Sequence, residues 1–281
     1  MAKKTISRLS VLAVLIVFLA ACSKTSEYTN VIPADASVVA SINLKSLAAK
    51  AGLNDKENEA AKQKVLEALK SGMNAATFQQ LEKVMNNPGE SGIDVESPFY
   101  AFSSSSFPYP AVVGKVSNED NLHASLDVMA KEQICQPVSE ADGYSFTTMN
   151  GSLLAFNNST VIIVTVNGTS QTDKAKEGIT ALMKQTADNS IVKSGAFQKM
   201  EKQKSDVNFF ASMDAIPSTY RNQVSMGLPA EVKPEDITFV SGLNFEKGKI
   251  VLKSENYTEN EAVKALLKKQ MESCLLYTSD A

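Results

Sequence analysis

Alternating apolar and polar residues predict short β-strands along much of the chain. In residues 37–44, Val38, Ala40 and Ile42 share one face, as expected of a strand with one buried side. Asn150-Gly151 predicts a type I′ hairpin turn between two strands. The two strands of this hairpin are predicted over 144–149 and 152–156. The pattern predicts further strands over 98–103, 111–116, 161–166, 207–213, 237–245 and 249–256.

Apolar residues three and four positions apart predict helices between these strands. Leu122, Leu126 and Met129 form such a stripe after Ser117, which we expect to be the N-cap residue. The other helices are predicted over 47–53, 56–71, 75–85, 172–185 and 194–204, with one more after Thr258.

The order of these elements predicts the α+β class, with antiparallel or mixed sheets that are each covered on one face by helices. Residues 32–189 form the first predicted unit and residues 190–273 the second. Residues 38–43 and 209–214 resemble each other in pattern, which leaves open a relation between the two units by duplication.

The N-terminus has the pattern of an export signal. Lys3, Lys4 and Arg8 precede an apolar run over residues 11–21, which is shorter than the roughly 20 residues of a membrane-spanning helix. We therefore expect a signal peptide over residues 1–21. Leu19-Ala20-Ala21-Cys22 has the pattern of a lipobox, which predicts cleavage before Cys22 and lipid on its thiol. The alternative is ordinary cleavage that leaves Cys22 free.

Lipid on Cys22 would hold the mature chain on a membrane without a spanning helix. Residues 22–31 are expected to be a polar tether. Glu27 is the one acidic residue among residues 23–27, whereas surface-exported lipoproteins tend to have an acidic cluster there. We therefore expect an outer-membrane lipoprotein of the cell envelope that faces the periplasm rather than the cell surface.

The last eight residues, 274–281, fit no element near them. They resemble a translated sequencing adapter, so we expect the second unit to be truncated near Ser273; the alternative is a genuine tail. With Cys22 lipidated and Cys274 in this tail, Cys135 has no disulfide partner, and we expect it to be a small buried hydrophobe.

Charge and motifs give little indication of catalysis. The net charge of −3 argues against a nucleic-acid surface. His123 is the single histidine, and we expect a structural role for it, with no metal site and no cofactor besides the lipid. Ser190 and Lys193 spell S-x-x-K, but the overlapping Lys193-Ser194-Gly195 makes this match to penicillin-binding enzymes a chance one. A remote pair of carboxylates stays possible.

An aromatic loop offers the one candidate contact surface. Phe107 and Tyr109 alternate with two prolines, and such rings can stack on sugars or dock a partner. We favour the interpretation that these rings fill the core. The other hypothesis makes Phe107 and Tyr109 candidate contact residues for an envelope protein or a glycan.

Cys22, residues 28–36 and the strand that follows resemble the opening of a bacterial lipoprotein family. This is domain-of-unknown-function family 4836, from gram-negative gut bacteria. Residues 199–210 are similar to its recurring helix-to-strand step. The resemblance implies an envelope lipoprotein and supplies no catalytic residues.

Taken together, these features predict a membrane-anchored binding or structural module without catalysis. The competing hypotheses are a glycan-acting hydrolase and an accessory subunit of an outer-membrane uptake or assembly complex.

Overall fold

The computed structural model describes residues 27–52, 58–70, 72, 74–216, 219–220, 233, 236–265 and 268–269. The predicted signal peptide, Cys22 and the tail 274–281 lie outside the described residues. The strands are β1 (Ala36–Ile42), β2 (Phe99–Ser104), β3 (Ala111–Lys115), β4 (Ser139–Ala141), β5 (Tyr144–Met149), β6 (Ser152–Phe156), β7 (Thr160–Thr165), β8 (Val207–Ser212), β9 (Thr238–Glu246) and β10 (Lys249–Tyr257). The α-helices are α2 (Leu44–Lys50), α3 (Glu59–Lys70), α4 (Ala75–Asn86), α5 (Glu119–Lys131), α6 (Thr169–Met183) and α7 (Gly195–Gln203), and the 3-10 helices are η1 (Glu27–Val31), η3 (Pro88–Ser91), η4 (Ala187–Asn189), η5 (Ile191–Lys193) and η6 (Met213–Ala215).

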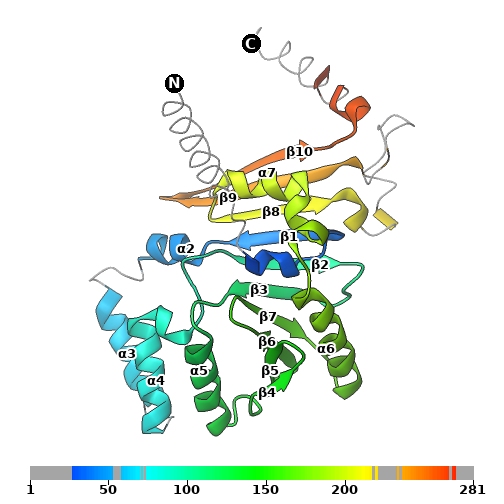
Figure 1. Ribbon diagram of the computed structural model, residues 1–281. Coiled ribbons are helices and arrows are strands. Elements are labelled where there is room, and N and C mark those ends of the chain that lie inside the picture. The colour runs from blue at the N-terminus through cyan, green and yellow to red at the C-terminus, as the bar shows by residue number, and fades with distance from the viewer. Residues whose placement is uncertain are drawn as a thin grey trace, which may run out of the picture.

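The described strands form one sheet in the order β10-β9-β8-β1-β2-β3-β7-β6-β5-β4 (Figure 1). Neighbouring strands are antiparallel throughout, which confirms the predicted α+β class. We expected a sheet in each unit, but the strands on both sides of residue 190 share this single sheet. The reason is that β1 pairs with β2 on one side and with β8 on the other. The two segments of similar pattern therefore lie on neighbouring strands.

One face of the sheet, here called the first face, is buried under helices. Its side chains include Val39, Tyr100, Val113, Leu153 and Phe210. The elements η1, α6, η5 and α7 cover this face and lie in front of the sheet in Figure 1. Their buried apolar side chains include Tyr28, Ile179, Ile191, Phe197 and Met200.

Residues that alternate with these point to the opposite, second face. At one end of it, α5 packs on β6 and β7 through the cluster Leu122, Leu126, Leu154, Phe156 and Val161. Helices therefore contact both faces, which corrects the expectation that each sheet is covered on one face. Further along the second face, Val112 and Ile163 are paired across β3 and β7, and both are exposed.

The last five residues of the predicted polar tether, 27–31, belong to the core instead. Residues 27–31 form η1, and Tyr28 and Val31 are buried. The Tyr28 hydroxyl donates to the Pro98 carbonyl at 2.8 Å, and the Tyr100 hydroxyl donates to Glu201 Oε2 at 2.8 Å. Burial raises the pKa of Glu201, against the opposing effect of the Tyr100 hydrogen bond. The apolar residues of this segment explain why it is ordered.

Asp206 joins α2 to the strands β8 and β9. Its carboxylate accepts from Lys50 Nζ at 2.6 Å, from Ser46 Oγ at 2.5 Å and from the Phe245 amide at 2.7 Å. The side chain is 2% exposed. Burial alone would raise the pKa of Asp206, but these hydrogen bonds outweigh it and hold the pKa below its usual value. Asp206 is therefore a charged structural junction.

Of two local predictions from the sequence, the hairpin turn is confirmed and the helix N-cap is wrong by one residue. Asn150 and Gly151 have φ of 44° and 76°, as the predicted type I′ turn requires. The N-cap of α5 is Asn118 rather than Ser117, because the Asn118 side chain accepts from the Asn121 amide at 2.9 Å. Among the described residues, no helix combines the length and the apolar character needed to cross a bilayer.

Candidate functional site

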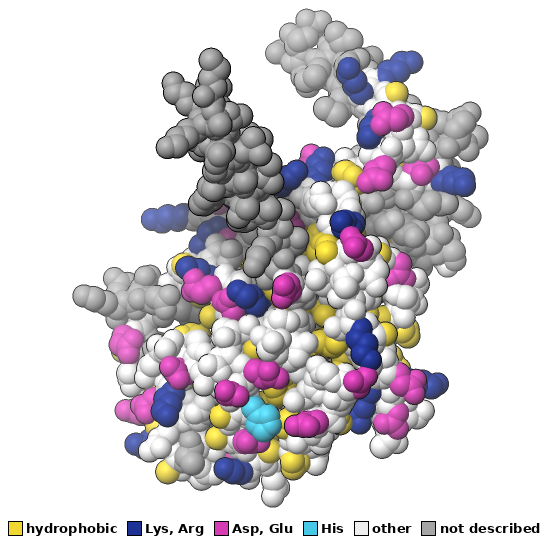
Figure 2. Space-filling view, viewed as in Figure 1, with side chains coloured by type: hydrophobic (Ala, Val, Ile, Leu, Met, Phe, Trp, Pro, Cys, Tyr) yellow, Lys and Arg dark blue, Asp and Glu magenta, His cyan; other side chains and the backbone are white. Residues whose placement is uncertain are grey.

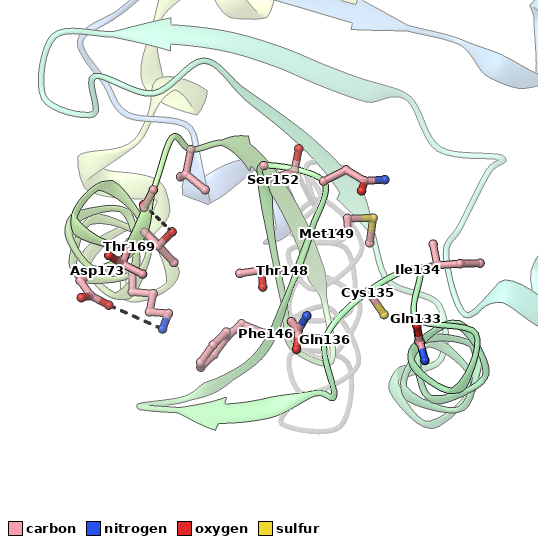
Figure 3. A pocket seen from close by; sticks show the side chains of 16 residues that line it. Gln133, Ile134, Cys135, Gln136, Phe146, Thr148, Met149, Ser152, Thr169 and Asp173 are labelled. Atoms are coloured by element: carbon pink, nitrogen blue, oxygen red, sulfur yellow. Dashed lines mark hydrogen bonds and ion pairs between the residues drawn. The ribbon is translucent and has the colours of Figure 1, made fainter.

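A hollow of about 540 Å³ lies beside the β5–β6 hairpin (Figure 3). We call it the hairpin cavity. Strand β5 contributes Phe146 and Thr148, and α6 contributes Asp173 and Lys176. The segment after α5 and the hairpin itself supply further lining residues, among them Gln133, Cys135, Gln136, Met149, Asn150 and Ser152. Amides and hydroxyls thus surround an aromatic ring and one pair of opposite charges.

The charged pair is tied to the aromatic ring. Lys176 Nζ lies 4.2 Å from the centroid of the half-buried Phe146 ring, within the range of a cation–π contact. The same Nζ lies 3.8 Å from Asp173 Oδ1, one helical turn earlier. The pair contributes no net charge to the cavity.

The walls of the cavity follow from local backbone geometry. Gln133 takes a left-handed φ of 58° after α5, and the Ile134 amide donates to the Met129 carbonyl at 3.0 Å. This arrangement ends the helix and reverses the chain. The Gln136 amide then donates to the Thr148 carbonyl at 2.9 Å. The segment is therefore fastened to β5 and forms one side of the cavity.

Cys135 is buried, as predicted. Its Sγ donates to the Leu126 carbonyl at 3.5 Å. The thiol is engaged with the end of α5, and Cys135 acts as a small hydrophobe beside the cavity.

A second hollow of similar volume, about 540 Å³, contains carboxylates that already have partners. Asp188 pairs with Lys193 at 3.1 Å, and Glu259 accepts from the Tyr257 hydroxyl at 2.8 Å. Asp236 accepts from Asn260 Nδ2 at 3.1 Å. These acids serve as hydrogen-bond acceptors that fix the surrounding loops.

The S-x-x-K match also lies beside this second hollow. Ser190 is buried and donates to the Ala187 carbonyl at 3.3 Å. Lys193 is instead paired with Asp188. Both side chains thus have structural partners of their own.

The aromatic loop is held against the core by Asp35. This carboxylate accepts from the hydroxyls of Ser104, Ser105 and Ser106 at 2.7, 2.6 and 2.7 Å, and from the Ser106 amide at 2.8 Å. Partial burial would raise the pKa of Asp35, but these hydrogen bonds outweigh it and lower the pKa. The serine run therefore directs the following residues inward.

Phe107 is a core residue and not a surface contact. It is 2% exposed and packs between Phe102 and Tyr109, with ring centroids 6.2 and 5.3 Å away. A Cβ at Gly178 of α6 would lie 2.7 Å from the Phe107 ring. This contradicts the contact hypothesis for Phe107 and agrees with the favoured core interpretation. Tyr109 is half-buried and packs against the same core, so its role as a contact residue stays a prediction.

His123 lies on the exposed side of α5. Its Nδ1 is 3.3 Å from Asp127 Oδ2, and its ring is edge-on to Phe156 with centroids 6.4 Å apart. Within the described part of the chain, no cluster of three His, Cys, Asp or Glu side chains could hold a metal ion.

Sequence reasoning did not find the hairpin cavity. Asp173 and Lys176 are spaced as a helical ion pair, and Phe146 is an aromatic residue in a predicted strand. Both signals are common in proteins, and only the packing of α6 against β5 brings these residues together. The face shown in Figure 2 adds no stronger signal, because acidic and basic side chains are interspersed over its described residues.

Comparison with known proteins shows the family of this chain. The family model described as "Domain of unknown function (DUF4836)" matches residues 28–280. No curated protein matches the chain. The solved structure of TP0453 in crystal form IV is similar over 83% of this chain and 81% of that chain, with 9% identity and a TM-score of 0.43. Crystal form III of TP0453 is similar over 88% of this chain and 87% of that chain, with 9% identity and a TM-score of 0.42.

We predict that Phe107→Ala lowers the free energy of unfolding by about 3–5 kcal/mol, because it removes a buried ring and leaves a cavity. Tyr109→Phe keeps its ring and is expected to change this free energy by less than about 0.5 kcal/mol. Urea unfolding of the full chain, followed by circular dichroism, measures both. A wild-type unfolding midpoint for Phe107→Ala would place Phe107 outside the core.

Proposed function

This chain belongs to the DUF4836 family, and we propose that it is an envelope lipoprotein that binds a neutral, hydroxyl-rich ligand of the glycan class without transforming it. The observation that carries this proposal is the lining of the hairpin cavity. An aromatic ring, several amides and hydroxyls, and one compensated ion pair meet there.

The chemistry of the lining matches such a ligand. An aromatic ring offers an apolar surface for stacking, and Phe146 lies at the cavity wall. The Gln133 and Gln136 amides can each donate and accept hydrogen bonds, as can the Thr148 hydroxyl. Because Asp173 and Lys176 compensate each other, an uncharged ligand fits better than an anion or a cation.

The carboxylates of the described chain favour binding over hydrolysis. Glycoside hydrolysis usually needs two carboxyl groups that flank the scissile bond. Asp173 is the one acid among the residues that line the hairpin cavity, and Lys176 is its partner. The acids of the second hollow hold loops in place. We therefore propose a non-catalytic role.

We also propose that lipid on Cys22 attaches the protein to the outer membrane on its periplasmic side. Four residues separate Cys22 from Glu27, where η1 begins, and the five steps between the two Cα atoms can span at most about 18 Å. Since η1 is part of the core, the folded body would lie close to the bilayer. Such an anchor would keep the hairpin cavity in the periplasm, where envelope and imported glycans are present.

For the cavity, we predict that wild-type protein binds at least one member of a panel of neutral oligosaccharides. Phe146→Ala is expected to weaken that binding about tenfold, because an aromatic residue that anchors a ligand belongs to the minority whose truncation costs more than about 1 kcal/mol. Tyr220→Ala removes an exposed aromatic that does not line the cavity and is expected to bind like wild type. Isothermal titration calorimetry measures the affinities.

Thermal unfolding of both variants checks that the fold is intact. Absence of binding to the whole panel would refute the proposed ligand class. Oligosaccharide cleavage detected by mass spectrometry would contradict the non-catalytic role and would indicate a hydrolase.

For the anchor, we predict that cells labelled with radioactive palmitate incorporate label into wild-type protein and not into Cys22→Ser, because the serine hydroxyl does not replace the thiol in lipidation. Cys135→Ser, which alters the buried cysteine, serves as the matched control and is expected to keep the label. Processing and labelling of Cys22→Ser at the wild-type level would refute the anchor.

A further inference from the structure

Within the described part of the chain, β10 ends the strand order and no strand pairs with its outer edge. It pairs with β9 over nine residues, and it stands at one end of the strand order. Most of its side chains are exposed. Figure 1 shows β10 at the end of the sheet opposite β4. A long strand with an unpaired edge is a template for pairing with another strand.

An apolar patch lies at this edge on the second face of the sheet. Phe245, Ile250 and Leu252 are 38%, 66% and 59% exposed. Ile250 pairs with Phe245 across β9 and β10, and Leu252 pairs with the half-buried Leu243. We call these four residues the β10 patch. Exposed apolar side chains that adjoin one another mark interaction surfaces more often than single ones do.

The outward hydrogen-bonding groups of β10 are set by the alternation of the ladder. The Phe245 amide points to the β8 side of β9, because it donates to Asp206. Glu246 therefore points to β10, where Lys249 is its partner. Counting alternately from Lys249, the backbone groups that point away from β9 belong to Ile250, Leu252, Ser254 and Asn256.

Charged side chains of β10 lie on the opposite, first face. Glu255 pairs with Lys199 of α7 at 2.9 Å, and Lys249 and Lys253 alternate with it along the same face. Two copies of β10 joined by a twofold axis would bring these charges together across the new edge. Each possible register of such a pairing can therefore be judged by whether it sets opposite or like charges across from each other.

We propose that a second copy of this chain pairs antiparallel with β10, with Leu252 opposite the partner's Leu252. In this register Lys249 lies opposite the partner's Glu255, twice in each dimer. Ile250 lies opposite the partner's Ser254 and diagonal to the partner's Leu252, so the two β10 patches become one apolar surface.

Neighbouring registers are less favourable. A pairing centred on Lys253 puts that lysine opposite the partner's Lys253, and one centred on Val251 puts Lys249 opposite the partner's Lys253. Like charges directly opposite each other destabilise a strand pair. A pairing centred on Ser254 matches Lys253 with the partner's Glu255, but it sets Leu252 opposite the partner's Asn256. Of these four registers, the one centred on Leu252 satisfies both charge and apolar contact.

The proposal is tested by exchanging the charges. Full chain is purified from membranes in detergent, and its mass is measured by light scattering over a range of concentrations. Wild type is expected to form dimers that dissociate on dilution. Lys249→Glu and Glu255→Lys are each expected to weaken the dimer roughly fivefold or more, because each places two pairs of like charges across the edge.

The double variant K249E/E255K restores opposite charges and is expected to restore the wild-type dimer. Its Lys249–Glu246 and Lys199–Glu255 ion pairs are both still absent, so these contacts within one chain cannot explain a rescue. Lys64→Glu on α3, at a distance from β10 in Figure 1, is the control and is expected to dimerise like wild type. A monomeric wild type, or a double variant no better than the single ones, would overturn the proposal.

Discussion

The described part of the chain depends on one continuous ladder of ten antiparallel strands, whose first face is covered by η1, α6, η5 and α7. Tyr28, Tyr100 and Phe197 form a row of rings across this covered face, with successive centroids 5.8 Å apart. Burial of each large apolar side chain contributes about 1.5–3 kcal/mol. A half-buried carboxylate needs a partner, and Glu201 has the Tyr100 hydroxyl. The segment that begins at Glu27 is thus part of the core.

The same ladder separates the two proposed interaction sites. The hairpin cavity lies beside β5 and β6, whereas β10 ends the sheet on the opposite side. Asp206 stiffens the β8–β9 side by joining α2 to both strands with a charge-assisted network. The proposed ligand binding and the proposed self-association would therefore use different parts of the sheet. A lipid-anchored dimer would hold two cavities at the same membrane surface.

Sequence patterns predicted the elements better than their assembly. The Asn150-Gly151 turn and the burial of Cys135 depend on local chemistry, and both were correct. The pairing of β1 with β8 joins residues about 170 positions apart, which periodicity alone does not detect. The serines and prolines around Phe107 left a surface role open beside the favoured core role, and Asp35, far away in the chain, turns its loop inward. The cavity was missed for the same reason, since it exists only where α6 packs beside β5.

Amide hydrogen exchange tests most directly the claim that the open edge of the ladder is an interface. The amides of Ile250, Leu252, Ser254 and Asn256 point away from β9, so we expect them to exchange rapidly in a monomer. We predict that their protection rises with protein concentration, while the protection of the α3 amides is unchanged. Equal exchange at low and high concentration would contradict it and would leave β10 a solvent-exposed edge.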